Sequence, residues 1–340
     1  MTTNLNFMDK TMIDLIGNTP LIKLKYPSEV TGCNIYGKAE FMNPGGSVKD
    51  RAAMGIILDA EKDKLIEKGG TVVEGTFGNT GIALTMINNS RGYKTIIVMP
   101  DGASLEKREI LTNLGAELRV VETKPYSDPG NYQHVSRRLV EELKDKSKGS
   151  VIWANQFDNT SNYLIHSKTT AKEIYNQLDG KIDGFTCAIG TGGTLAGTSV
   201  GLKNLDKNIK IACADPQGAR MYRYFKDSVL EVTGDPSETE GIGQYRITKN
   251  VEACQVDMAY HVSDSEAFEL LYKLIKTEGL FLGTSCGVNI AGAMKMAKDL
   301  GPGKNIVTIL CDDAYKYFSK MFNKEFLISK KLPMPDWFDK

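Results

Sequence analysis

A run of small residues, Gly190-Thr191-Gly192-Gly193-Thr194, follows the apolar segment 185–189 and precedes an amphipathic segment. Backbone N–H groups at a helix N-terminus, with threonine hydroxyls beside them, form a site for a phosphate dianion, and glycines let the ligand approach the backbone. A tight turn with a helix cap would have a similar composition, but so many consecutive small residues favour a ligand. The sequence therefore predicts a phosphate site at 190–194.

The glycine run alone leaves open which phosphate compound binds. A dinucleotide is one interpretation, because Asp215 ends the next predicted strand near the place of a ribose-binding acid, as in an NAD-dependent dehydrogenase. The third glycine of that motif, however, would be residue 195, which is leucine. A Walker P-loop is excluded because the run does not end in Gly-Lys-Ser/Thr.

Lys49 lies in a second glycine-containing segment, 43–51, in the first turn of a predicted helix. The positive end of the helix dipole disfavours an ammonium group there and favours the neutral, nucleophilic amine. A solvated lysine paired with Asp50 is an equally good interpretation of the spacing.

Two further polar glycine loops, 75–81 and 283–287, also precede predicted helices. In the first loop, free N–H groups and the side chains of threonine and asparagine would suit a carboxylate. Loops of this kind converge at the carboxyl ends of parallel strands. Together, the four glycine-containing segments indicate a phosphate-bearing cofactor and an anionic substrate.

From residue 34 onward, short β-rich runs alternate with amphipathic stretches, which is typical of an α/β fold with a largely parallel sheet. A capping box is predicted from Ser47 and Asp50, and Ser263 or Asp264 is predicted to cap a later helix. Loops are predicted at 124–131 and 233–239. The predicted strands are 35–41, 71–74, 95–99, 118–121, 151–153, 185–189, 209–214 and 306–311. The predicted helices are 48–65, 82–89, 105–114, 135–144, 194–205, 264–277 and 289–300.

The composition excludes several classes of function. Lys and Arg number 42, as do Asp and Glu, so the formal net charge is zero and nucleic acid is not an expected partner. Apolar runs such as 96–99 are far too short to span a membrane. Residues 1–6 lack the features of a secretory signal, so a cytoplasmic location is expected. The 3 His and 6 Cys show no metal-ligand spacing; the cysteines are expected in the core and no metal is expected.

Taken together, these segments resemble the cysteine synthase and cystathionine β-synthase branch of the fold type II pyridoxal phosphate (PLP) enzymes. The resemblance covers nearly the whole chain. It is carried by 17–21, the Asn-Pro-Gly-Gly-Ser-Val-Lys-Asp-Arg motif at 43–51, Trp-Ala-Asn-Gln-Phe-Asp-Asn at 153–159, the loop at 190–194, Glu-Gly-Ile-Gly at 240–243, and 286–287.

The resemblance implies roles for residues at matching positions. Lys49 would form the Schiff base with PLP and, once freed, remove the Cα proton of the substrate. Asn79 would contact the ring hydroxyl, and Ser285 would contact the pyridine nitrogen. A neutral serine there leaves the nitrogen unprotonated and favours elimination over transamination. The implied phosphate ligands are Gly190, Thr191, Gly192, Gly193 and Thr194. The implied substrate site contains Thr76, Phe77, Asn79, Thr80, Gln156 and Gly241.

Three departures from the family pattern concern specificity. Phe77 stands where cysteine synthases usually carry a small polar residue, so the donor or nucleophile pocket should differ. Glu240, as in cystathionine β-synthase, could act catalytically by activating water or an amine, or could cap a loop. Asp312-Asp313 stands where family members often carry Asp-x-Gly, and the sequence gives no account of this change.

The resemblance implies a two-domain fold and a β-replacement activity. Two three-layer α/β domains with mostly parallel sheets are expected, as in the tryptophan synthase β subunit: a small mobile domain at 46–154 that binds the substrate carboxylate, and a large PLP-binding domain at 1–45 plus 155–340. A homodimer is implied. The expected reaction runs through an aminoacrylate, with O-acetylserine and sulfide giving cysteine and acetate. Alternatives within the family are cysteine hydroxyl-lyase or desulfhydrase, serine sulfhydrylase, or replacement by another nucleophile. An NAD-dependent dehydrogenase and a catalytically silent binding or sensor protein are the alternatives outside it.

Overall fold

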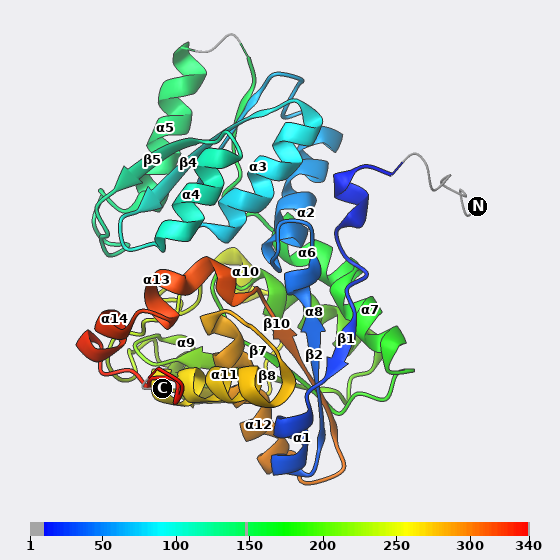
Figure 1. Ribbon diagram of the computed structural model, residues 1–340. Coiled ribbons are helices and arrows are strands. Elements are labelled where there is room, and N and C mark those ends of the chain that lie inside the picture. The colour runs from blue at the N-terminus through cyan, green and yellow to red at the C-terminus, as the bar shows by residue number, and fades with distance from the viewer. Residues whose placement is uncertain (1–9, 147–148, 339–340) are drawn as a thin grey trace.

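The computed structural model describes residues 10–146 and 149–338, and this part of the chain forms two β-sheets (Figure 1). The larger sheet has six strands in the order β1, β2, β10, β7, β8, β9, and the smaller has four in the order β5, β4, β3, β6. β1 pairs with β2 antiparallel, whereas the other pairings are parallel. Residues 1–6, on which the expected cytoplasmic location rests, lie outside the described residues.

The strands and helices have the following bounds. The strands are β1 (Leu21–Lys23), β2 (Asn34–Ala39), β3 (Thr71–Gly75), β4 (Lys94–Pro100), β5 (Glu117–Val121), β6 (Val151–Trp153), β7 (Gly184–Cys187), β8 (Lys210–Pro216), β9 (Met258–Val262) and β10 (Asn305–Leu310). The helices are α1 (Lys25–Thr31), α2 (Lys49–Lys62), α3 (Asn79–Arg91), α4 (Leu105–Asn113), α5 (Tyr132–Lys146), α6 (Ser161–Lys168), α7 (Thr170–Gln177), α8 (Gly193–Leu205), α9 (Met221–Asp227), α10 (Lys249–Glu252), α11 (Asp264–Glu278), α12 (Thr284–Leu300), α13 (Phe318–Met321) and α14 (Lys324–Ser329). Short 3₁₀ turns are η2 (Met12–Leu15), η3 (Glu40–Met42) and η4 (Ala314–Tyr317).

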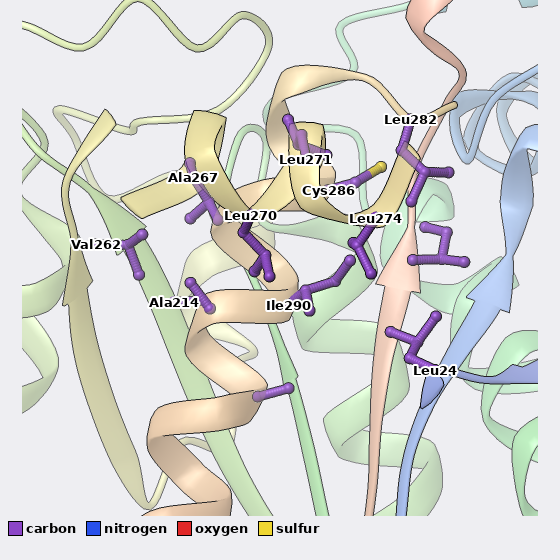
Figure 2. Close-up of a cluster of buried hydrophobic side chains, with 14 of the residues drawn as sticks. Leu24, Ala214, Val262, Ala267, Leu270, Leu271, Leu274, Leu282, Cys286 and Ile290 are labelled. Atoms are coloured by element: carbon purple, nitrogen blue, oxygen red, sulfur yellow. The ribbon is translucent and has the colours of Figure 1, made fainter. Parts of the chain in front are cut away.

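The six-stranded sheet is buried on both faces, because successive strand residues point to opposite sides and both sides are apolar. Along β10, Ile306 packs with residues of α11 and α12, whereas Val307 packs with residues of α7 and α8. Figure 2 shows the apolar cluster on the Ile306 side of the sheet, which contains Leu271 and Leu274 of α11 and Ile290 of α12.

The four-stranded sheet follows the same rule. Along β4, Ile96 and Val98 pack with residues of α5, whereas Ile97 and Met99 pack with residues of α3 and α4. Each sheet therefore lies between two helical layers, which confirms the predicted α/β class with two mostly parallel sheets.

All of the strands and helices predicted from the sequence form, with ends shifted by a few residues. The prediction missed β1 and β9; four of the five residues of β9 are only half-buried, so this edge strand has no apolar run. It also missed α6, whose buried positions include the polar Asn162 and His166, and α7, which follows after a break at Thr169. The other missed helices, α1, α9, α10, α13 and α14, have only four to seven residues.

One predicted helix cap is wrong and one is confirmed. Val48, not Ser47, occupies the N-cap of α2, and the carboxylate of Asp50 accepts a hydrogen bond from the backbone N–H of Gly45. Asp50 thus closes the glycine turn in place of the capping box. Ser263 caps α11 as predicted, with Glu266 completing the capping box.

No helix in the described ranges is long and apolar enough to cross a lipid bilayer. This finding agrees with the short apolar runs of the sequence.

A buried charge network anchors α2 to the six-stranded sheet. The Arg51 guanidinium is fully buried and lies 2.8 Å from Glu40 Oε2 and 2.7 Å from Glu173 Oε1. Glu173 also lies 2.7 Å from the buried Lys38 ammonium, and Thr19 donates a hydrogen bond to Glu40. Burial opposes ionisation of Glu173, but Arg51 and Lys38 lower the pKa of its carboxyl to about 2. The network joins β2, η3, α2 and α7.

Removal of one buried charge from this network should be costly, because it leaves an unpaired buried ion. Glu40→Gln is expected to reduce the free energy of unfolding by about 3–5 kcal/mol. Urea denaturation followed by circular dichroism measures the loss. The matched control is Glu117→Gln, whose partner Arg119 is exposed, with an expected loss below about 1 kcal/mol. Equal losses in the two variants would show that the network contributes no more than a surface ion pair.

Glu74 on β3 is a buried carboxyl whose titration should be visible in stability. Burial raises the pKa of Glu74 from 4.5 to about 8, against the opposing effect of hydrogen bonds from Gln156. Between these two values the folded protein holds a proton that the unfolded chain releases, so this group makes stability fall as pH rises.

Glu74→Gln should remove that dependence. The free energy of unfolding of the variant relative to wild type is expected to rise between about pH 4.5 and about pH 8. Urea titrations across this range measure it, with Glu109→Gln as an exposed control. A difference that stays constant with pH would contradict the assignment.

Candidate functional site

A cavity of about 960 Å³ lies between the two sheets. Its walls come from the segments that follow β3, β4, β5, β6, β7, β8 and β10, and from the starts of α2 and α12. The carboxyl ends of parallel strands meet at one edge of a sheet, and the two sheets turn these edges toward the same space. Segments far apart in the sequence therefore face one cavity.

Most of the site residues predicted from the sequence line this cavity. They are Lys49, Thr76, Phe77, Asn79, Thr80, Gln156, Gly190, Thr191, Glu240, Gly241 and Ser285. Three predicted phosphate ligands, Gly192, Gly193 and Thr194, do not belong to its lining. The Thr194 hydroxyl is 3.3 Å from Nε2 of the buried His166.

The glycine loop at 190–194 has the shape of an anion cradle. Gly192 is the N-cap of α8 and has a φ of +96°, which favours glycine. A Cβ at Gly190 would overlap the carbonyl oxygen of Gly241, so the loop at 240–243 can lie directly against the phosphate loop. The N–H of Gly193, the first residue of α8, donates a 3.2 Å hydrogen bond to the Thr191 hydroxyl, and the next N–H groups of this first turn have no partner within the helix.

Lys49 is the first residue of α2, as predicted, and its side chain lines the cavity. The alternative that Lys49 pairs with Asp50 is wrong, because Asp50 binds Gly45 and no carboxylate of the described residues lies within 4.0 Å of the Lys49 ammonium. An unpaired lysine amine at the positive end of a helix dipole is available for covalent chemistry.

The loop before α3 forms a second wall suited to a carboxylate. Thr80 donates a 2.6 Å hydrogen bond to Oε1 of Gln156, and both side chains are buried. Gly78, the N-cap of α3, has a φ of +138°, and a Cβ there would contact the aliphatic chain of Lys107. Hydroxyl and amide groups therefore surround the N-terminus of α3 without adding charge.

These residues fit PLP. Asn79 Oδ1 is buried and has no hydrogen-bond partner among the described residues, and the Ser285 hydroxyl lines the same cavity. Lys49 would hold the aldehyde carbon, the start of α8 the phosphate, and Ser285 the pyridine nitrogen. The unpaired amine suits the aldehyde of this cofactor, the glycine cradle suits its phosphate, and the unpartnered amide oxygen suits its ring hydroxyl.

Phe77 lines the cavity and packs edge-to-face on Tyr132, with ring centroids 5.5 Å apart. Its ring bridges two apolar clusters of the four-stranded sheet. Phe77 therefore occupies part of the cavity wall and holds the loop on α5, and its predicted effect on the donor or nucleophile pocket stays a prediction.

Glu240 is buried between two lysines. Its carboxylate lies 2.7 Å from the Lys107 ammonium and 2.6 Å from that of Lys320. Burial alone would raise the pKa of this carboxyl, but the two ammonium groups hold it below its usual value. Such a carboxylate is a weak proton acceptor, so the geometry favours an electrostatic contact between the two sides of the cavity.

Asp215 does not support the dinucleotide interpretation. It is fully buried, is not part of the cavity lining, and accepts a 2.8 Å hydrogen bond from the backbone N–H of Tyr222. Asp215 therefore stabilises the start of α9 and cannot bind a ribose in this cavity.

Several lining residues were not predicted as site residues. Cys311 was assigned to the core, yet it lines the cavity at the end of β10. Lys107, Tyr317, Lys320 and Arg220 also line it. They belong to helices and loops without a motif, so spacing along the chain carried no signal for them.

Comparisons with known proteins were consistent with this site. A family model described as pyridoxal-phosphate dependent enzyme matches residues 12–312. The chain is 47% identical to cysteine synthase 1 of Neurospora crassa over 328 aligned residues. The alignment covers 95% of this chain and 86% of that protein.

Solved structures agree in fold. An O-acetylserine dependent cystathionine beta-synthase from Helicobacter pylori is 34% identical, with a TM-score of 0.80 and coverage of 92% of this chain and 97% of that one. A hydrogen sulfide-producing enzyme from Fusobacterium nucleatum is 34% identical, with a TM-score of 0.78 and coverage of 91% and 99%.

These similarities confirm the predicted family, the α/β fold class and PLP as the cofactor, and they overturn the dehydrogenase alternative with its NAD. The chain belongs to the cysteine synthase and cystathionine β-synthase family of PLP-dependent enzymes.

Proposed function

We propose that this enzyme is a cysteine synthase, which replaces the acetate of O-acetylserine with sulfide. The observation that carries the proposal is the placement of Lys49, without an acid partner among the described residues, in one cavity with the first residues of α3 and with Gly190 and Thr191, which precede α8. The 47% identity to cysteine synthase 1 of Neurospora crassa supports the same activity.

Each wall of the cavity has a separate task in this proposal. PLP bound at Lys49 would supply an electron sink for the bond changes at Cα and Cβ of the substrate. The start of α8 binds the phosphate, and Thr76, Thr80 and Gln156 orient the substrate carboxylate at the start of α3. The neutral Ser285 hydroxyl leaves the pyridine nitrogen unprotonated, which favours loss of a β-substituent over transamination.

Lys49 is the residue to which we assign proton transfer at Cα, because its amine lies in the cavity without a competing carboxylate. Glu240 is held by Lys107 and Lys320, and we assign it an electrostatic role in joining the two sides of the cavity.

The small domain at 46–154 is proposed to close over the substrate. Lys107 belongs to this segment and Glu240 to the rest of the chain, so their ion pair would form or break as the domain moves. Closure would exclude water during the reaction. A homodimer and a cytoplasmic location stay predictions.

A second candidate function is β-replacement by a thiol that carries a carboxylate. Arg220 lines the cavity, its Nε is buried without a hydrogen-bond partner, and no carboxylate of the described residues lies within 4.0 Å. Apart from Lys49, the other lining cations of the described residues are paired: Lys107 and Lys320 with Glu240, Lys124 with Glu122, and Arg246 with Asp158. Arg220 could therefore bind the acid group of a second substrate. Release of sulfide from cysteine, or sulfhydrylation of serine, would use the same residues.

Lys49→Ala tests the proposed cofactor attachment. Wild-type protein incubated with PLP and borohydride should gain a reduced PLP adduct that peptide mass spectrometry maps to Lys49. The variant should gain no adduct, and its turnover of O-acetylserine with sulfide should fall by about 10²- to 10⁴-fold. Lys62→Ala, at the exposed end of the same helix, should behave as wild type. An adduct on another lysine would overturn the assignment, and PLP binding without turnover would favour the silent binding protein.

Arg220→Gln separates the two candidate nucleophiles. If a carboxylate-bearing thiol is used, the variant should raise the KM for 3-mercaptopropionate by about tenfold or more and leave the KM for sulfide unchanged. The uncharged 3-mercaptopropanol controls for thiol reactivity. Arg223→Gln is the matched protein control, because Arg223 is paired with Asp227 and Glu231 outside the cavity lining. If the KM for each of the two thiols is the same in the Arg220→Gln variant as in wild type, the second candidate function is wrong.

A further inference from the structure

Asp312 joins the two sides of the cavity through Asn79. It follows β10 in the six-stranded sheet and is fully buried, whereas Asn79 is the first residue of α3 beside the four-stranded sheet. Asn79 Nδ2 donates a 2.6 Å hydrogen bond to Asp312 Oδ2, and the Tyr317 hydroxyl donates to the same oxygen. A buried carboxylate thus receives two donors from different parts of the chain.

These hydrogen bonds set the orientation of the Asn79 amide. An ionised carboxylate only accepts hydrogen bonds, so the amide must turn its nitrogen toward Asp312. Its oxygen, Oδ1, is then left in the buried wall of the cavity with no partner among the described residues. Without Asp312 the amide could rotate by half a turn and exchange its oxygen and nitrogen.

Asp312 itself is held firmly and is not part of the cavity lining. Its carbonyl oxygen accepts a 3.0 Å hydrogen bond from the N–H of Gly283, and its backbone forms a bridge with Ser47. A Cβ at Gly283 would overlap Asp312 Oδ1, so the loop at 283–287 packs directly on the carboxylate. Asp312 is thus fixed by the loop that carries Ser285 and by the segment that precedes Lys49.

We infer that Asp312 is a positioning residue that orients the Asn79 amide toward the ring hydroxyl of PLP. This inference rests on the proposed function and on the role of Asn79 in it. Asp312 does not touch the cofactor; it acts by fixing which atom of Asn79 the ring meets, and hence the protonation of the ring hydroxyl. Asp313, its neighbour, instead caps η4 through the backbone N–H of Tyr315.

Asp312→Ala removes the carboxylate that accepts the hydrogen bond from Asn79, and the spectrum of bound PLP in this variant tests the inference. The absorption and fluorescence of the cofactor, and the pH at which the absorption changes, are expected to differ from those of wild type. Turnover should fall by about tenfold or more, because a hydrogen bond to a charged group is lost. Asp312→Asn should restore the wild-type spectrum, since its amide oxygen can accept the same hydrogen bond. Asp313→Ala is the matched control and should leave the spectrum unchanged.

A double-mutant cycle with Asn79→Ala shows whether Asp312 acts through Asn79. The spectrum and turnover of the double variant should match those of Asn79→Ala alone. Additive effects, or a wild-type spectrum in Asp312→Ala, would overturn the inference. Thermal unfolding of the cofactor-free variants checks that they fold. If the Asp312→Ala variant does not fold, Asp312→Ser replaces it, because a serine side chain is too short to reach Asn79, and the same change in the PLP spectrum is expected. A wild-type chain that binds no PLP would overturn the proposed function and this inference with it, whereas additive variants of an active wild type overturn only the inference.

Discussion

The position of Lys49 depends on a buried guanidinium. Arg51 follows Lys49 by two residues on α2 and is clamped between Glu40 of η3 and Glu173 of α7. A charge in this apolar setting is stable only while both carboxylates remain in place, so the first turn of α2 cannot shift without breaking the network. Arg51 thereby also fixes the backbone of Lys49, which in the proposed function holds the cofactor in one orientation.

In the proposed function, helix N-termini more than charged side chains bind the anions in this cavity. α3 and α8 both begin at glycines with a positive φ, where side chains would overlap Lys107 and Val251. Gly78 and Asn79 at the start of α3 and Gly190 and Thr191 before α8 line the cavity, and the dipoles of the two helices add partial positive charge there. A dianionic phosphate and an amino-acid carboxylate can bind in this way without lysines that would compete with Lys49 for the reacting carbon.

Polar groups across the cavity are paired with one another, and this pairing identifies the groups that await a ligand. Asn79 binds Asp312 and Lys107 binds Glu240, so each contact joins one sheet to the other. Among the described residues of the lining, the polar groups without a hydrogen-bond or ion-pair partner include the Lys49 amine, Asn79 Oδ1 and Arg220 Nε. Buried polar groups are costly when left unpaired, so these are the positions where substrate or cofactor atoms are expected.

The sequence by itself determined the parallel α/β fold and predicted the phosphate loop, because each depends on a local pattern: apolar alternation or consecutive glycines. The role of Lys49 was predicted from the family resemblance, since its spacing alone fitted a lysine paired with Asp50 equally well. It could not resolve β9, whose edge position leaves it half-buried, or α6, which buries Asn162 and His166. The partners of Glu240 and Asp312 were decided only by the tertiary structure. Lys107 is 133 residues from Glu240, and Asn79 is 233 residues from Asp312. Such contacts arise from how two sheets face each other, and no spacing along the chain encodes that distance.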